Sequence, residues 1–109
     1  MKKYSFAVLL ILSIILMIGC SGPDTEGKTY SIIYDANGAT YGLPPTDNNR
    51  YTSGKSAKVL DKNNLSKDGF EFLSWNTKKQ GDGEKYNPGE FITVKNRNIR
   101  LYAIWGILR

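Results

Sequence analysis

The first residues of the chain form an apolar run that ends at the single cysteine, and this run is not expected to belong to the folded domain. Residues 4–18 are almost wholly apolar, follow two lysines, and lead through Gly19 to Cys20. A positive start, an apolar stretch and a small residue at its end are typical of a secretory signal peptide. A membrane-spanning helix needs about 20 apolar residues, and this run is shorter. We therefore expect residues 1–19 to be removed by cleavage.

The remaining chain is long enough for one small domain. About 90 residues support a single core that is marginal unless it packs well. The sequence has one cysteine and no histidine, so the domain has no internal disulfide and lacks the commonest general base and metal ligand. The formal charge of +5 falls to +3 once the two signal lysines are removed. This mild basic bias does not predict a nucleic-acid-binding protein.

The residues before the cysteine suggest a lipid anchor. Leu16-Met17-Ile18-Gly19-Cys20 resembles the lipobox of bacterial lipoproteins. The resemblance implies cleavage between Gly19 and Cys20 and a diacylglyceryl thioether on Cys20, whose lipid would be the membrane partner. It places the protein in the cell envelope, on the outer face of the cytoplasmic membrane or on an outer membrane. The alternative is a free thiol at the end of a signal peptide.

A short polar tether is expected between this anchor and the domain. Residues 20–28 are rich in Ser, Gly, Pro, Asp and Glu and show no apolar period, which is typical of a linker. Fully extended, they reach at most about 26–29 Å. The domain at residues 29–105 must therefore stay close to its membrane, and residues 106–109 are interpreted as a C-terminal tail.

The periodicity of the domain predicts strands. Enrichment in β-branched and aromatic residues, with near alternation of apolar and polar positions, is typical of half-buried strands. No segment has a long helical stripe, which excludes a helical bundle. The expected fold class is α+β, mostly β, with at most one short helix. We expect strands at 29–34, 55–60, 70–75, 91–94 and 99–105, a long loop at 39–49, a helical turn at 63–69 and a turn-rich segment at 76–89.

Apolar residues on these strands are candidates for the core. Each aromatic side chain buries 150–250 Å², which a small domain needs. The alternative is that the aromatic side chains form a binding platform for sugars. The predicted core residues are Ile32, Tyr34, Leu65, Phe72, Trp75, Leu101, Ala103 and Trp105.

Three blocks of sequence point to a family. Residues 34–38 (YDANG), 65–77 (LSKDGFEFLSWNT) and 101–105 (LYAIW) resemble, in order and spacing, the internalin-type B repeat, also called the Listeria–Bacteroides repeat. The resemblance implies a small β-grasp-like, ubiquitin-related sheet and a place in a bacterial surface protein. The family usually occurs as tandem copies between other modules. This chain has a single copy and no leucine-rich domain, so the partners of larger members do not carry over.

Basic residues gather in the second half of the chain. They are Lys78, Lys79, Lys85, Lys95, Arg97 and Arg100. As a candidate contact surface, they would bind a protein or an anionic cell-wall or surface polymer, with about 1 kcal/mol for each basic residue near an anionic surface. The alternative is ordinary solubilising charge. Nucleic acid is not an expected partner, and the oligomeric state is left open.

No residue pattern indicates a metal, a cofactor or catalysis. Asp82, Glu84 and Glu90, with Asn76 and Asn87, carry oxygen ligands, but their spacing matches no EF-hand loop and lysines are interleaved. No serine–lysine motif stands at a strand-to-helix elbow, and no pair of carboxylates stands out for glycoside cleavage. We therefore expect no catalytic residue, no metal and no cofactor.

The leading hypothesis is a membrane-anchored surface lipoprotein that acts as a non-enzymatic interaction or adhesion module. It would bind through a sheet face, an exposed edge strand or its basic end. The first alternative is a structural spacer or remnant repeat without a ligand. The second is a small hydrolytic enzyme.

Overall fold

The computed structural model describes residues 27–109, so Gly19, Cys20 and most of the expected tether lie outside the described residues. The described part holds six strands and no helix. No segment within it forms a helix that is long and apolar enough to cross a membrane. The strands are β1 (Ile32–Asp35), β2 (Ser56–Lys58), β3 (Phe70–Asn76), β4 (Lys85–Tyr86), β5 (Phe91–Thr93) and β6 (Ile99–Ile107).

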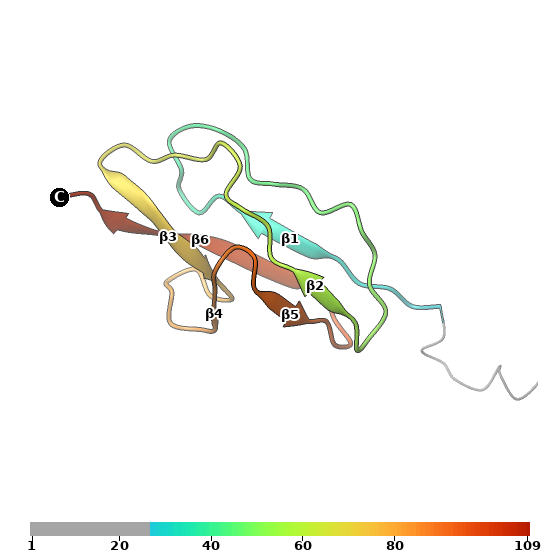
Figure 1. Cartoon of the computed structure of the whole chain (residues 1–109). Coiled ribbons are helices and arrows are strands. Elements are labelled where there is room, and N and C mark those ends of the chain that lie inside the picture. The colour runs from blue at the N-terminus through green and yellow to red at the C-terminus, as the bar shows by residue number, and fades with distance from the viewer. Residues whose placement is uncertain (1–26) are drawn as a thin grey trace, which may run out of the picture.

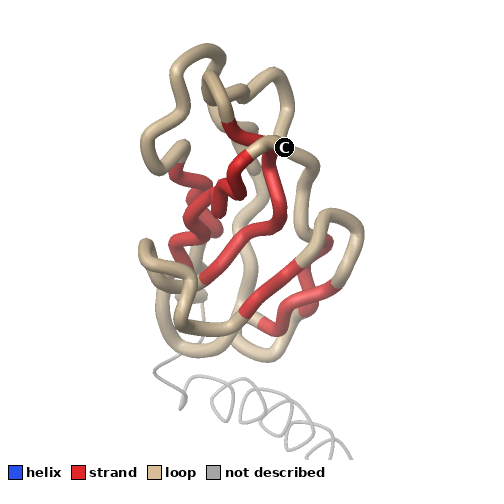
Figure 2. Tube along the Cα trace, turned by 90° about the vertical axis from the view of Figure 1, so that its left-hand side faces the viewer, coloured by secondary structure: helices blue, strands red, loops and turns tan. Residues whose placement is uncertain are grey.

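The strands form two sheets (Figure 1). The larger has the order β1-β6-β3-β4, in which β6 pairs parallel with β1 and antiparallel with β3, and β4 is antiparallel to β3. The smaller is an antiparallel ribbon of β2 and β5. Figure 2 shows this ribbon beside the larger sheet, with long loops at one end of the molecule. The expectation of a mostly-β domain with at most one short helix is confirmed.

The core lies between the two sheets, because both contribute its buried side chains. The larger sheet supplies residues from β1, β3 and β6, the ribbon supplies residues from β2 and β5, and Leu65 comes from the loop before β3. Phe72 and Trp105 are half-buried and pack against the margin of this cluster. The buried cluster consists of Ile32, Tyr34, Ala57, Val59, Leu65, Trp75, Ile92, Val94, Leu101 and Ala103.

A β-bulge in β3 turns Trp75 into this core. Strict alternation would place Phe72 and Trp75 on opposite faces of the strand. The pairing with β6 shifts register between Phe72 and Ser74, so Leu73 is the extra residue. Phe72 and Trp75 therefore lie on the same side, with ring centroids 5.1 Å apart in an edge-to-face arrangement. Leu73 is 51% exposed.

The turn after β1 is tied to the last strand. The Asp35 carboxylate accepts a hydrogen bond from the Asn37 amide at 2.8 Å, and Asn37 has a positive φ of 45°. The Asn37 side chain donates to the Ala103 carbonyl at 2.8 Å, and the Trp105 indole donates to the carbonyls of Ala36 and Asn37. These bonds connect two of the three sequence blocks, 34–38 and 101–105.

Three expectations about the elements were wrong. The segment 63–69 is not a helical turn, because Asn63 has a positive φ of 64° and Ser66 forms an isolated bridge with Tyr41. The segment 76–89 contains a short strand, β4, where a loop was expected. The last strand runs to Ile107, which takes in two residues of the expected tail. Both strand errors arise from pairing with β3, which the local sequence does not reveal.

Candidate functional site

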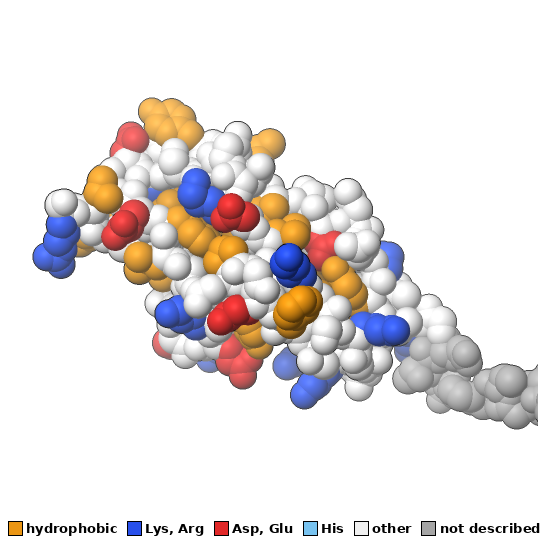
Figure 3. Space-filling view, viewed as in Figure 1, with side chains coloured by type: hydrophobic (Ala, Val, Ile, Leu, Met, Phe, Trp, Pro, Cys, Tyr) orange, Lys and Arg blue, Asp and Glu red, His pale blue; other side chains and the backbone are white. Residues whose placement is uncertain are grey.

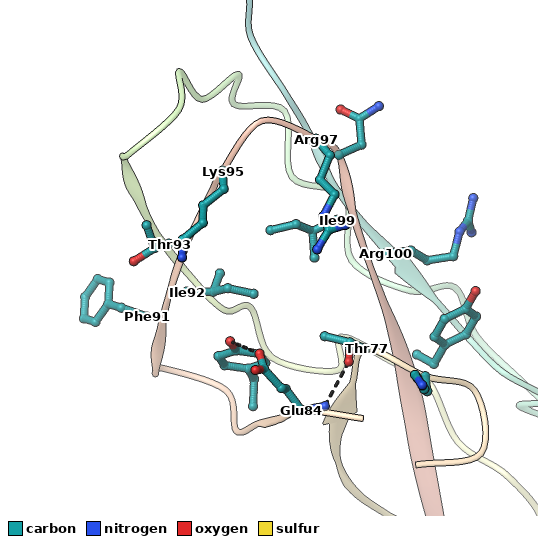
Figure 4. A pocket seen from close by; sticks show the side chains of 13 residues that line it. Thr77, Glu84, Phe91, Ile92, Thr93, Lys95, Arg97, Ile99 and Arg100 are labelled. Carbon is teal, nitrogen blue, oxygen red and sulfur yellow. Dashed lines mark hydrogen bonds between the residues drawn. The ribbon is translucent and has the colours of Figure 1, made fainter. Parts of the chain in front are cut away.

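A hollow with a volume of about 810 Å³ opens beside the start of β6. Its walls come from the loop that follows β3, from β4, β5 and the turn at 95–98, and from β6. Figure 4 shows Phe91 and Thr93 on one side, Arg100 on the other, and Ile92 and Ile99 between them. We call this feature the basic hollow, because Lys78, Lys95, Arg97 and Arg100 line it.

Four of the six predicted basic residues therefore meet at one place. The other two, Lys79 and Lys85, are exposed but do not line the basic hollow. Lys85 lies on β4 opposite Asn76, and Lys79 lies in the loop between β3 and β4. Figure 3 shows basic and acidic side chains interspersed on the face seen in Figure 1. The hollow is thus a local concentration of positive charge on a mixed surface.

Two carboxylates moderate this charge. Arg100 forms an ion pair with Asp35 at 3.2 Å, and both side chains are partly exposed. Such a pair is worth little to stability in water, so a stronger anionic ligand can compete for the guanidinium. Glu84 also lines the hollow and accepts a hydrogen bond from the Tyr86 hydroxyl at 3.0 Å. Burial, followed by this bond to Glu84, raises the pKa of the Tyr86 hydroxyl above its ordinary value.

Buried Asn76 shapes the loop that carries Lys78. Its side-chain oxygen accepts hydrogen bonds from the amides of Lys78 and Gly83, each at 2.9 Å. Its side-chain nitrogen donates to the Gly81 carbonyl at 3.2 Å. Because Asn76 is only 3% exposed, these bonds replace contacts with water and fix the path of the loop.

We expect Asn76→Ala to lower the free energy of unfolding by about 2–4 kcal/mol, because it removes three hydrogen bonds of about 1 kcal/mol each and leaves partly buried backbone groups without their partners. Urea unfolding of residues 24–109 measures this loss. The control is Gln80→Ala, an exposed position on the same loop, which should stay within about 0.5 kcal/mol of the parent. Equal midpoints and slopes for both variants would contradict the organising role of Asn76.

Three of the oxygen-bearing residues that were weighed as calcium ligands form hydrogen bonds within the protein. Asn76 holds the loop, Glu84 faces Tyr86, and Glu90 accepts a hydrogen bond from the Asn87 amide at 2.8 Å. Within residues 27–109, no group of three or more His, Cys, Asp or Glu side chains is placed to hold a metal ion.

Sequence reasoning missed the uncharged part of the hollow. Thr77, Tyr86, Phe91 and Tyr102 line it beside the cations, although they are spread over 26 positions of the chain. Phe91 carried a signal, since it is an aromatic residue at an expected strand start, and the structure leaves it 65% exposed. Its neighbour Ile92 faces the core instead, as strand alternation requires.

Comparison with known proteins identifies related sequences. A family model described as the Listeria-Bacteroides repeat domain matches residues 30–104. A protein of Evansella cellulosilytica named as a Gly-rich membrane protein is 35% identical over 79 residues, which are 72% of this chain and 9% of that protein. Another protein named as a membrane protein of that bacterium is 31% identical over 79 residues, covering 72% of this chain and 12% of its own length. The chain thus spans about a tenth of these relatives. No solved structure gives a significant match.

Proposed function

This chain belongs to the Listeria-Bacteroides repeat domain family, and from that premise we propose that it is a lipid-anchored, non-enzymatic interaction module of the bacterial cell envelope. Cys20 would carry the lipid after cleavage behind Gly19, and the β domain would bind an anionic partner at its surface. The observation that carries the proposal is the convergence of Lys78, Lys95, Arg97 and Arg100 on one hollow.

The sequence around the anchor supports the location. A lipobox-like string ends at Cys20, and nine residues separate that cysteine from Tyr30, which forms an isolated β-bridge with Tyr51. The two relatives are named as membrane proteins, which is compatible with an envelope location for this chain. A tether of this length keeps the basic hollow within a few nanometres of the membrane, roughly the 26–29 Å of an extended linker plus the domain itself.

A fragment without the N-terminal apolar run contains the whole hydrophobic core and is suited to experiments. Every buried residue of the core lies between Ile32 and Ala103, so residues 24–109 retain all of it. We call this part of the chain the soluble domain, and it can be studied without the apolar N-terminal run.

We expect the soluble domain to sediment with isolated bacterial envelopes in a salt-sensitive manner, because exposed charges are screened within about 10 Å at 0.1 M salt. The double variant Lys95→Glu/Arg97→Glu should bind about tenfold more weakly. The matched control, Lys79→Glu/Lys85→Glu, makes the same change of net charge away from the hollow and should bind like the parent.

Two results would count against the proposal. Equal losses in the two double variants would mean that overall charge, not the basic hollow, drives envelope binding. Absence of any sedimentation would favour a spacer without a ligand. Circular dichroism of each variant establishes that the fold is retained, since all four substituted residues are exposed.

A further inference from the structure

One wall of the basic hollow is a strand edge without a neighbour. In the ribbon, the Val59 amide donates to the Glu90 carbonyl and the Val94 amide donates to the Lys55 carbonyl, each at 2.8 Å. Backbone groups of alternate residues point to opposite edges of a strand. Those of Phe91 and Thr93 therefore point away from β2, toward an edge of β5 that no strand of the described chain occupies.

The opposite wall is also an open strand edge. The Ile99 amide donates to the Ser31 carbonyl at 3.0 Å, on the β1 side of β6. By the same alternation, the backbone groups of Arg100 point to the β3 side. There the pairing of β3 with β6 ends at Asn76 opposite Tyr102. Beyond it the chain no longer pairs with β6, since the Lys78 amide bonds to the Asn76 side-chain oxygen at 2.9 Å.

We propose that the basic hollow binds an extended acidic peptide of a partner protein, which adds as a strand to these open edges. The proposal rests on the proposed function and specifies the partner class. An extended chain supplies alternating amides and carbonyls, which can form hydrogen bonds with the outward-facing backbone groups of Phe91, Thr93 and Arg100. Carboxylates on the same chain complement the lining cations Lys95 and Arg97.

The floor of the hollow selects the pattern of that peptide. Ile99 lies between the two edges (Figure 4), and Ile92 adds only the small part of its side chain that is not packed in the core. Alternate side chains of a strand point to opposite faces. One set of peptide side chains would therefore face Ile99, while the other set would face solvent, within reach of the exposed Lys95 and Arg97 side chains. Apolar residues that alternate with Asp or Glu satisfy both requirements.

An anionic polymer such as polyphosphate is the competing ligand. It would bind the same cations but would form no hydrogen bonds with the outward-facing backbone groups of Phe91, Thr93 and Arg100. Hydrogen bonding by these backbone groups is thus the property that separates the two partners.

The test uses the isotope-labelled soluble domain and a blocked pentapeptide of alternating valine and glutamate. We expect saturable shifts of the Phe91, Thr93 and Arg100 amides in nuclear magnetic resonance spectra, with hydrogen exchange at these amides slowed about tenfold or more. Lys95→Glu/Arg97→Glu should weaken the affinity about tenfold, whereas Lys79→Glu/Lys85→Glu should not. A peptide N-methylated at alternate amides should lose most of its affinity, since it cannot pair as a strand.

The proposal is overturned if the N-methylated peptide or polyphosphate binds as tightly as the pentapeptide without protecting these amides. It is also overturned if the pentapeptide gives no shifts at millimolar concentration. In either case, envelope sedimentation that still depends on Lys95 and Arg97 leaves the proposed function standing with a different ligand. If envelope sedimentation also no longer depends on Lys95 and Arg97, both the peptide proposal and the proposed function are overturned.

Discussion

Trp75→Ala is expected to lower the free energy of unfolding by about 3–5 kcal/mol. Small domains are stable by only about 5–15 kcal/mol in total, so this single substitution removes a large share and leaves a substantial unfolded population. The side chain is fully buried. It touches both halves of the core, because its indole donates to the Leu60 carbonyl at 2.9 Å while its ring packs against Tyr34 and Phe72.

Thermal and urea unfolding of the soluble domain measure this effect. Phe91→Ala is the matched control, since it removes another aromatic ring from a strand but at a position that is 65% exposed. It should cost less than about 1 kcal/mol.

Trp75→Phe separates packing from hydrogen bonding. It keeps an aromatic ring but leaves the Leu60 carbonyl without its donor, which costs about 1–3 kcal/mol. The expected order of stability is therefore the parent and Phe91→Ala first, then Trp75→Phe, then Trp75→Ala. A Trp75→Ala variant that melts with the parent would show that this indole does not support the core.

Cys20→Ala is expected to abolish lipid incorporation completely. Cys20 is the only cysteine in the sequence, so no other thiol can form the thioether. Burial of an acyl chain contributes about 0.8 kcal/mol per methylene, and a single chain holds a protein only weakly, so durable anchoring requires more than one. Because there is a single attachment site, the variant should lose both the label and durable membrane anchoring.

Metabolic labelling with a clickable fatty acid, followed by mass spectrometry of the mature protein, measures this outcome. Ser21→Ala is the neighbouring control and should label like the parent. Labelling that persists in Cys20→Ala would place the lipid elsewhere. An intact Met1 on the mature parent protein would disprove cleavage and remove the basis for the short tether.

The strands whose apolar and polar residues alternate locally could be predicted from the sequence. β3 begins at Phe70 and β6 at Ile99, as expected, because their apolar and aromatic residues repeat with a local period. β2 and β5 are shorter than expected by a few residues at most. The sequence also suits the turn observed at 35–38, since Asp35, Asn37 and Gly38 are residues whose chemistry favours turns.

Features that depend on distant partners could not be predicted. The bulge at Leu73 exists only relative to β6, and β4 exists only as a partner of β3. The segment 63–69 has the composition of a helical turn, but the bridge between Ser66 and Tyr41 imposes another conformation. Each of these results from tertiary pairing, which overrides weak local propensity.

The candidate site could be predicted only in part, because its composition is local but its arrangement depends on the fold. Residue type alone identified Lys78, Lys95, Arg97 and Arg100, which the structure brings together. It could not separate them from Lys79 and Lys85, because the division depends on how the loop after β3 folds over Asn76. The open backbone edges at Phe91 and Arg100 have no sequence signature at all, since they are defined by where neighbouring strands end.

The parallel pairing of the first and last strands determines how the domain would respond to mechanical load. β1 and β6 run side by side over the register from Ile32–Ile99 to Asp35–Tyr102, and the described chain enters and leaves at opposite ends of the sheet (Figure 1). Tension between the proposed anchor and the residues after β6 would slide the two strands past each other. The evenly spaced hydrogen bonds between these parallel strands would bear that load together, so the domain would resist being pulled apart from its proposed anchor.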